Sequence, residues 1–195
     1  MAAEVQDYMR CCNTCQRDKV SRHKQYGLLD PLEVPYRPWS SILMDWIVEL
    51  LELGGCMHIC IIMDQLTKMA HFILLKTRIT APELTQVFLW VIWKWYRLPD
   101  KIIIDRDTKI TSLFWQKLLD LIGIISKMMM VFHPQSDRQI ERINQILEEY
   151  LRNYCLWKQD NWDELLPLAE YAYNSAISET TKISPIYPNY GFKPK

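Results

Sequence analysis

The sequence predicts an α/β fold: a mixed sheet of five strands with helices on both of its faces. Three strand-like segments, 41–51, 57–63 and 69–75, follow one another directly, which favours an antiparallel meander. After residue 80, helical and strand-like segments alternate, and this order is typical of parallel crossovers. The strands expected at the centre of the sheet are almost continuously apolar, because a central strand is buried on both faces.

Helical spacing of apolar residues predicts the elements that cover the sheet. The first helix spans 80–97 and begins with a capping box formed by Thr80 and Glu83. The elements predicted after it are a strand at 101–105, a helix at 112–122, a strand at 124–132, a polar loop at 133–138 and helices at 139–154 and 161–174.

The composition is that of one globular domain. Apolar residues make up 49% of the 195 residues, and 23 basic side chains balance 23 acidic ones. Zero net charge argues against binding nucleic acid by bulk attraction alone, although it leaves room for a local basic face. The longest uncharged apolar run, 87–93, is far shorter than the roughly 20 residues of a membrane span. The first residues lack a secretory signal, so we expect an intracellular protein with no membrane partner.

The first 30 residues differ from the rest of the chain. Cys11, Cys12 and Cys15 lie within five residues, a poor disulfide framework that indicates a reducing compartment. A linker follows, and its segment 17–24 carries four basic side chains against one acid. This strip is either a solvated surface or a contact for phosphates. The compact domain is expected to span 36–195.

Two predicted central strands carry an acid where the pattern calls for an apolar residue. Asp45 lies inside the first strand, and Asp105 ends the strand at 101–105. A buried carboxylate needs a cation or strong donors, although an edge position could explain either acid alone. Glu141, in the first turn of the helix at 139–154, borders its apolar stripe; alone it would be a charge that stabilises the helix dipole. Together, the three would offer six oxygens to Mg²⁺ or Mn²⁺.

Motifs along the chain, from about residue 5 to residue 195, carry a resemblance to a known family. Asp105 and Glu141 are separated by 35 residues. Further motifs lie at 12–17, 26–29, 66–72, 98–99, 133–135, 141–145, 165–170 and 189–192. The chain resembles the integrase of gypsy-type LTR retrotransposons and, more broadly, the retroviral integrase catalytic core with its RNase H-like fold.

The resemblance implies DNA integration by a polynucleotidyl transferase. Asp45, Asp105 and Glu141 would be the catalytic triad and the metal ligands, holding two Mg²⁺ or Mn²⁺ ions. Donor DNA ends would be processed and joined to target DNA by phosphodiester displacement. The implied partners are donor and target DNA and further copies of the chain in an oligomer, acting in the nucleus. The candidate nucleic-acid contacts are Arg106, His133, Gln135, Arg138, Arg142, Asn144 and Gln145.

The chain also departs from the family pattern. Cys12 and Cys15 match half of a zinc-binding module, so residues 1–30 are expected to be a truncated remnant of it plus a basic linker, without a complete Zn²⁺ site. Asp107 and Arg138 stand where the family has Gly, which suggests reduced mobility at the active site. The alternatives are a non-catalytic retroelement remnant or domesticated nucleic-acid-binding protein, and a stand-alone RNase H-like nuclease. The chain is also expected to be a fragment of a polyprotein.

Overall fold

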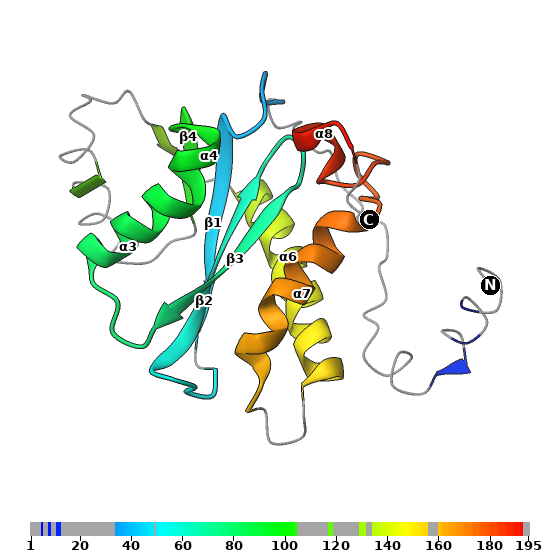
Figure 1. Cartoon of the computed structure of the whole chain (residues 1–195). Helices are drawn as coiled ribbons and strands as arrows, with labels where there is room; N and C mark the ends of the chain where they lie inside the picture. The colour runs from blue at the N-terminus through cyan, green and yellow to red at the C-terminus, as the bar shows by residue number, and fades with distance from the viewer. Residues whose placement is uncertain are drawn as a thin grey trace.

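A five-stranded mixed sheet forms the centre of the molecule, in the order β3-β2-β1-β4-β5 (Figure 1). The computed structural model describes residues 5, 8, 11–12, 34–48, 50–104, 117–118, 129–131, 134–155 and 160–192, of which 104, 129–131 and 134–139 are described by their backbone alone. The strands are β1 Ser41–Ile47, β2 Cys56–Asp64, β3 Ala70–Lys76, β4 Lys101–Ile104 and β5 Met129–Val131.

The strand directions follow the predicted topology. β2 runs antiparallel to both β1 and β3, which makes the meander. β4 runs parallel to β1, with Met44 opposite Ile104, and β5 runs parallel to β4. β1 contains Asp45, and β4 directly precedes Asp105 in the sequence. These two strands are therefore neighbours at the centre of the sheet.

Helices cover both faces of this sheet, as predicted (Figure 1). One face packs against α3 Ala81–Phe88 and the π-helical turn η1 Leu89–Trp93, which continues into α4 Lys94–Tyr96. The other face packs against α6 Pro134–Tyr154 and α7 Trp162–Ser175. A short helix, α8 Tyr187–Tyr190, follows near the C-terminus.

Side-chain alternation along β1 assigns each of its residues to one face. Ile42 and Met44 belong to the core under α3, whereas Leu43 and Ile47 belong to the core under α6 and α7. Because side chains alternate along a strand, Asp45 faces the same side as Leu43 and Ile47. The acid in β1 therefore faces α6 and α7.

Several predicted boundaries were wrong. α6 begins at Pro134, so the predicted polar loop at 133–138 is helical from its second residue. Proline is well suited to the first helical position, where its missing N–H costs no hydrogen bond. β1 ends at Ile47 instead of continuing to residue 51, because the apolar Leu50 and Leu53 pack against the core as part of the connection to β2.

The helix predicted at 80–97 also differs in its second half. Its capping box is confirmed, because the backbone N–H of Thr80 donates to Glu83 Oε2 over 2.8 Å. Beyond Phe88 the chain widens into η1, which apolar spacing did not predict. The predicted helix at 112–122 lies outside the described residues except for 117–118, which are helical. Of the described helices, none is both long and apolar enough to cross a bilayer.

Arg97, which ends α4, has a backbone conformation that favours glycine. Its φ is 68° and its ψ is −174°, a region that side chains with a Cβ rarely adopt. Arg97→Gly is expected to raise the free energy of unfolding by about 1 kcal/mol, since the relief of strain exceeds the entropic cost of glycine. Urea unfolding would measure the change. Arg97→Ala is the control, because it removes the same exposed side chain but keeps the strain.

Candidate functional site

Asp45 is the centre of the candidate site. It lies in the middle of β1, half-buried, on the face that packs against α6. Its Oδ2 accepts a hydrogen bond from Asn144 Nδ2 over 2.7 Å, and its Oδ1 accepts one from the backbone N–H of Trp46 over 2.8 Å. Both carboxylate oxygens are thus held in place by neutral donors, which fixes the direction in which the charge points.

Asn144 links this acid to Glu141. Both residues belong to α6 and are three positions apart, so they lie on neighbouring turns of the same side of the helix. Glu141 is exposed, whereas Asn144 is half-buried. The Oδ1 atom of Asn144 is buried and has no hydrogen-bond partner among the described residues. The turn that carries Glu141 therefore lies next to β1, beside a buried acceptor with unused capacity.

Asp105 lies just outside the described residues. It follows Ile104, the last residue of β4, and Ile104 is paired with Met44, the residue before Asp45. The two acids therefore follow directly on paired positions of neighbouring parallel strands. Within the described ranges, no three His, Cys, Asp or Glu side chains gather as a metal cluster. The spacing of the three predicted carboxylates stays a prediction.

The chain was compared with known proteins. No family model matches it. It is 32% identical to the Tf2-3 transposon polyprotein of Schizosaccharomyces pombe over 191 residues, which is 98% of this chain but 14% of the polyprotein. The chain therefore spans about one seventh of the length of this relative.

Two solved structures show the same fold. One is an intasome of simian T-cell lymphotropic virus in complex with the PP2A regulatory subunit B56 gamma, with a TM-score of 0.62, 17% identity, and 97% of this chain and 67% of that chain covered. The other is the HTLV-2 integrase catalytic core domain in complex with magnesium, in a trimeric form, with a TM-score of 0.56, 16% identity, and 80% and 99% covered. The chain has the fold of an integrase catalytic core and is a homologue of retrotransposon polyproteins.

The structure describes only some of the other residues that were predicted to contact nucleic acid. Gln145 is exposed on α6, next to Asn144. Arg142 forms an ion pair with Glu179, from the segment that follows α7. Gln135 and Arg138 belong to α6, where only their backbone is described, and Arg106, His133 and Asp107 lie outside the described residues.

The predicted zinc remnant is only partly within the described residues. Cys12 is half-buried, and its backbone N–H donates to the carbonyl oxygen of Tyr8 over 2.9 Å. Cys15 lies outside the described residues. The expectation that this pair forms no complete zinc site therefore stays a prediction.

A further acid, Asp64, belongs to the motifs that carry the resemblance, but no role was assigned to it from the sequence. It ends β2 and is completely buried. Its Oδ1 accepts the backbone N–H of Trp39 over 2.9 Å, and its Oδ2 accepts both the backbone N–H of Thr67 over 3.0 Å and the Thr67 hydroxyl over 2.6 Å. The backbone N–H of Leu66 also donates to Oδ1 over 3.3 Å, so four donors occupy the carboxylate and Asp64 holds the turn after β2 to the segment before β1. An acid three residues before Thr at the end of an apolar strand is the signal of such a turn.

Proposed function

We propose that this chain is the catalytic core of an integrase-type strand transferase, which joins donor DNA ends to target DNA. The observation that supports this most is the hydrogen bond between Asn144 and Asp45, because it holds the turn carrying Glu141 against β1. Homology to transposon polyproteins and the fold of integrase cores support the same function. Asp105, which directly follows β4 in the sequence, would complete the proposed site.

The proposed residues fit a pair of Mg²⁺ or Mn²⁺ ions. Carboxylate oxygens are the ligands that these hard cations prefer, and Asp45, Asp105 and Glu141 would supply them. The buried Oδ1 of Asn144, without a partner in the described part of the chain, is a further oxygen beside Asp45. When bound, such ions stabilise the negative charge that develops on the phosphate and on the attacking and leaving oxygens.

The residues of the chain would orient this reaction. An oxygen of water or of a DNA 3′-hydroxyl forms a bond to phosphorus as the opposite phosphorus–oxygen bond breaks; the nucleophile loses its proton to solvent, and the leaving oxygen gains one. Asp45 needs no rearrangement, because Asn144 and the N–H of Trp46 already hold its two oxygens. Gln145 is exposed next to this turn and could donate to a DNA phosphate.

Divalent-metal dependence provides the direct test. With Mg²⁺ or Mn²⁺, the chain is expected to join short duplexes with free 3′-hydroxyls to a plasmid. The same ions are expected to raise the melting temperature, because they relieve repulsion among the carboxylates and bind only the folded state. Strand-transfer products on a gel and thermal melts with and without metal would measure both effects. A chain that binds DNA but shows neither effect would contradict the proposal.

The second candidate function is a non-catalytic nucleic-acid-binding remnant. It is favoured by Asp107 and Arg138, which, by the resemblance stated above, stand where the family has Gly. Asp107 would add a negative charge close to the bound DNA, and Arg138, which belongs to α6, would leave the start of that helix less mobile than Gly would. If the chain is inert but Arg138→Gly combined with Asp107→Gly joins DNA, the second function describes this copy and the site assignment survives.

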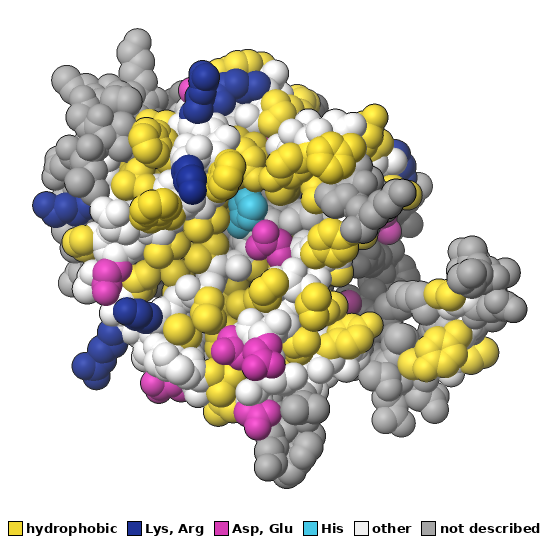
Figure 2. Space-filling view, viewed as in Figure 1, with side chains coloured by type: hydrophobic (Ala, Val, Ile, Leu, Met, Phe, Trp, Pro, Cys, Tyr) yellow, Lys and Arg dark blue, Asp and Glu magenta, His cyan; other side chains and the backbone are white. Residues whose placement is uncertain are grey.

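We also propose that the working form is an oligomer. Apolar side chains spread over the face of the molecule on which α3, α4 and α7 lie (Figure 2). Trp90, Trp93 and Trp95 are 66%, 45% and 68% exposed, and Leu168 of α7 is 58% exposed. Three exposed tryptophans within residues 90–95 place apolar area on one short segment, and exposed apolar patches mark sites of protein association.

Charged substitutions test this surface. Trp93→Glu combined with Leu168→Glu is expected to shift the chain toward the monomer, because an interface would have to bury two unpaired carboxylates. Sedimentation velocity would measure the distribution. Val48→Glu, at an exposed apolar position at the end of β1, is the control and is expected to leave the distribution unchanged. A wild-type chain that is monomeric at all concentrations would contradict the proposal.

A further inference from the structure

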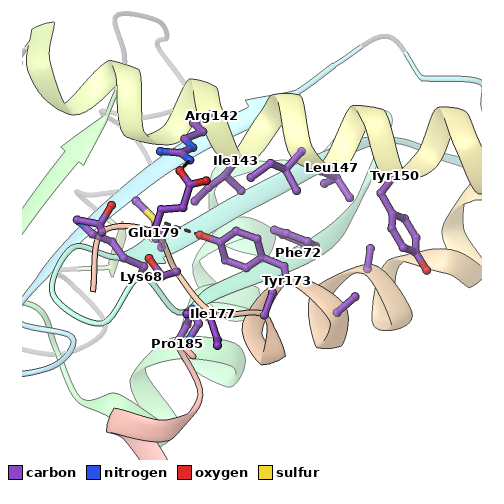
Figure 3. A pocket seen from close by; sticks show the side chains of 17 residues that line it. Lys68, Phe72, Arg142, Ile143, Leu147, Tyr150, Tyr173, Ile177, Glu179 and Pro185 are labelled. Carbon is purple, nitrogen blue, oxygen red and sulfur yellow. Dashed lines mark hydrogen bonds and ion pairs between the residues drawn. The ribbon is translucent and has the colours of Figure 1, made fainter. Parts of the chain in front are cut away.

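An ion pair between Arg142 and Glu179 joins α6 to the segment that follows α7 (Figure 3). Arg142 comes directly after Glu141 in α6, and it lies three residues before Gln145. Residues three apart are neighbours on the surface of a helix, so Arg142 and Gln145 lie side by side. Arg142 is therefore a positive side chain on the same turns of α6 that carry the candidate site.

Glu179 is presented to Arg142 by a turn with its own backbone hydrogen bonds. The N–H of Ser178 donates to the carbonyl oxygen of Ile183 over 3.0 Å, and the N–H of Lys182 donates to the carbonyl oxygen of Ser178 over 2.8 Å. Figure 3 shows the side chain of Glu179 reaching from this turn toward Arg142. The fold of the segment between α7 and α8 thus holds an acid opposite the arginine.

Both members of the ion pair are accessible to solvent. The side chains of Arg142 and Glu179 are 42% and 65% exposed. Exposed ion pairs contribute little to stability, because water solvates the separated charges almost as well. Glu179 takes part in a further interaction as well, so its carboxylate would not be isolated if Arg142 turned away. The pair can therefore open at small cost.

A DNA phosphate offers Arg142 the same kind of partner as Glu179 does. Carboxylate and phosphate both present two oxygens to the planar fork of N–H donors in a guanidinium group. In the proposed function the reacting phosphate lies beside Glu141, so other phosphates of the same DNA would lie near the exposed surface of α6. A phosphate that approaches Arg142 meets the negative charge of Glu179, and the two anions therefore compete for one guanidinium.

We propose that Glu179 is an exchangeable counter-ion, which holds Arg142 in the free chain and is replaced by a backbone phosphate when DNA binds. Arg142 then positions the DNA along α6, and Glu179 weakens DNA binding because it competes for Arg142. This inference rests on the proposed function, which places DNA beside Glu141. DNA binding can be measured without divalent metal, so its test does not require strand transfer.

A double-mutant cycle tests the competition, with the fluorescence anisotropy of a labelled short duplex as the measurement. Glu179→Gln is expected to raise DNA affinity about 2–5-fold, the effect of removing one exposed ion pair. Arg142→Gln is expected to lower the affinity and to reduce the slope of log affinity against log salt by about 0.9, the share of one phosphate contact. In the Arg142→Gln chain, Glu179→Gln is expected to have almost no effect.

Two further variants complete the cycle. Glu179→Ala also removes the carboxylate and should raise DNA affinity as Glu179→Gln does. Glu148→Gln is the matched control, because it removes the same charge from an exposed position of α6. If Glu148 acts only by general repulsion of DNA, its substitution should have the same effect with and without Arg142. Thermal melts of all variants are expected to match the wild type, since these side chains are exposed or half-buried.

The outcomes separate this inference from the proposed function. Equal gains from Glu179→Gln with and without Arg142 would mean general repulsion and would overturn the inference, as would a salt slope that Arg142→Gln leaves unchanged. If the chain joins DNA but the cycle shows no coupling, only the competition by Glu179 is wrong. If the coupling is found but no metal supports joining, only the proposed function is wrong. A wild-type chain that binds no duplex would overturn both.

Discussion

Glu141→Gln is expected to abolish metal-dependent strand transfer and leave the fold unchanged. Glu141 is exposed on α6, so its amide analogue should cost little stability. The substitution removes one anionic oxygen ligand from the two proposed metal ions. Because bound metal ions supply several kcal/mol of charge stabilisation in such reactions, the joining rate should fall by about 100-fold or more. The rise of the melting temperature with Mn²⁺ should shrink in the same variant.

The chain offers a matched control on the same helix. Glu148 is also exposed on α6, seven residues further along, so Glu148→Gln removes the same charge from almost the same side. This variant should join DNA at the wild-type rate.

Asn144→Ala should show an intermediate loss of about 10–100-fold, as expected for a residue that orients a metal ligand. Equal activity of the Glu141 and Glu148 variants would remove Glu141 from the site.

The sheet could be predicted because its signals are local and strong. The central strands β1 and β4 are mostly apolar, and the capping box of Thr80 and Glu83 marks the start of a helix. The mixed strand order follows from three strands in succession and then alternation with helices. The parallel pairing of β1 with β4 then pairs Met44 with Ile104, the residues that directly precede Asp45 and Asp105 in the sequence.

The errors have a common physical origin, which is that apolar spacing reports burial and not hydrogen bonding. Leu50 and Leu53 are apolar because they pack against a core, although neither belongs to β1. The π-helical turn η1 still buries Ile92 and packs Leu89 and Val91 against the core, so the apolar spacing of the sequence indicates only helix. The start of α6 has few apolar residues, and only Pro134 signals it.

The candidate site could be predicted as a set of residue types but not as a set of contacts. Asn144 was expected to contact nucleic acid, yet its amide donates to Asp45. The two residues are 99 positions apart, and their contact arises because α6 packs across β1. Nothing local in either segment indicates this packing. Asp64, also an acid in an apolar strand, resembles Asp45 in sequence but is fully enclosed by donors.

Because donors enclose the carboxylate of Asp64 completely, we expect Asp64→Asn to lower the free energy of unfolding strongly. The carboxylate of Asp64 accepts bonds from Trp39 and Thr67, and all of these donors are buried with it. An amide keeps one acceptor atom and turns its NH₂ group toward the N–H and O–H donors that lose their partner. Unsatisfied buried groups and the loss of charge-assisted bonds should together cost about 3 kcal/mol or more. For a chain of this size, the melting temperature should fall by roughly 6–12 °C.

Urea unfolding and strand-transfer assays together would distinguish a structural role of Asp64 from a catalytic one. Asp100→Asn is the matched control, because Asp100 is an exposed acid that accepts bonds from Tyr36 and Arg37, and exposed pairs contribute less than about 1 kcal/mol. Well below its melting temperature, the Asp64→Asn chain should still respond to Mn²⁺ and still join DNA, since Asp64 has no free oxygen to offer a metal. An Asp64→Asn chain that unfolds like the wild type but no longer joins DNA would instead place Asp64 in the catalytic site.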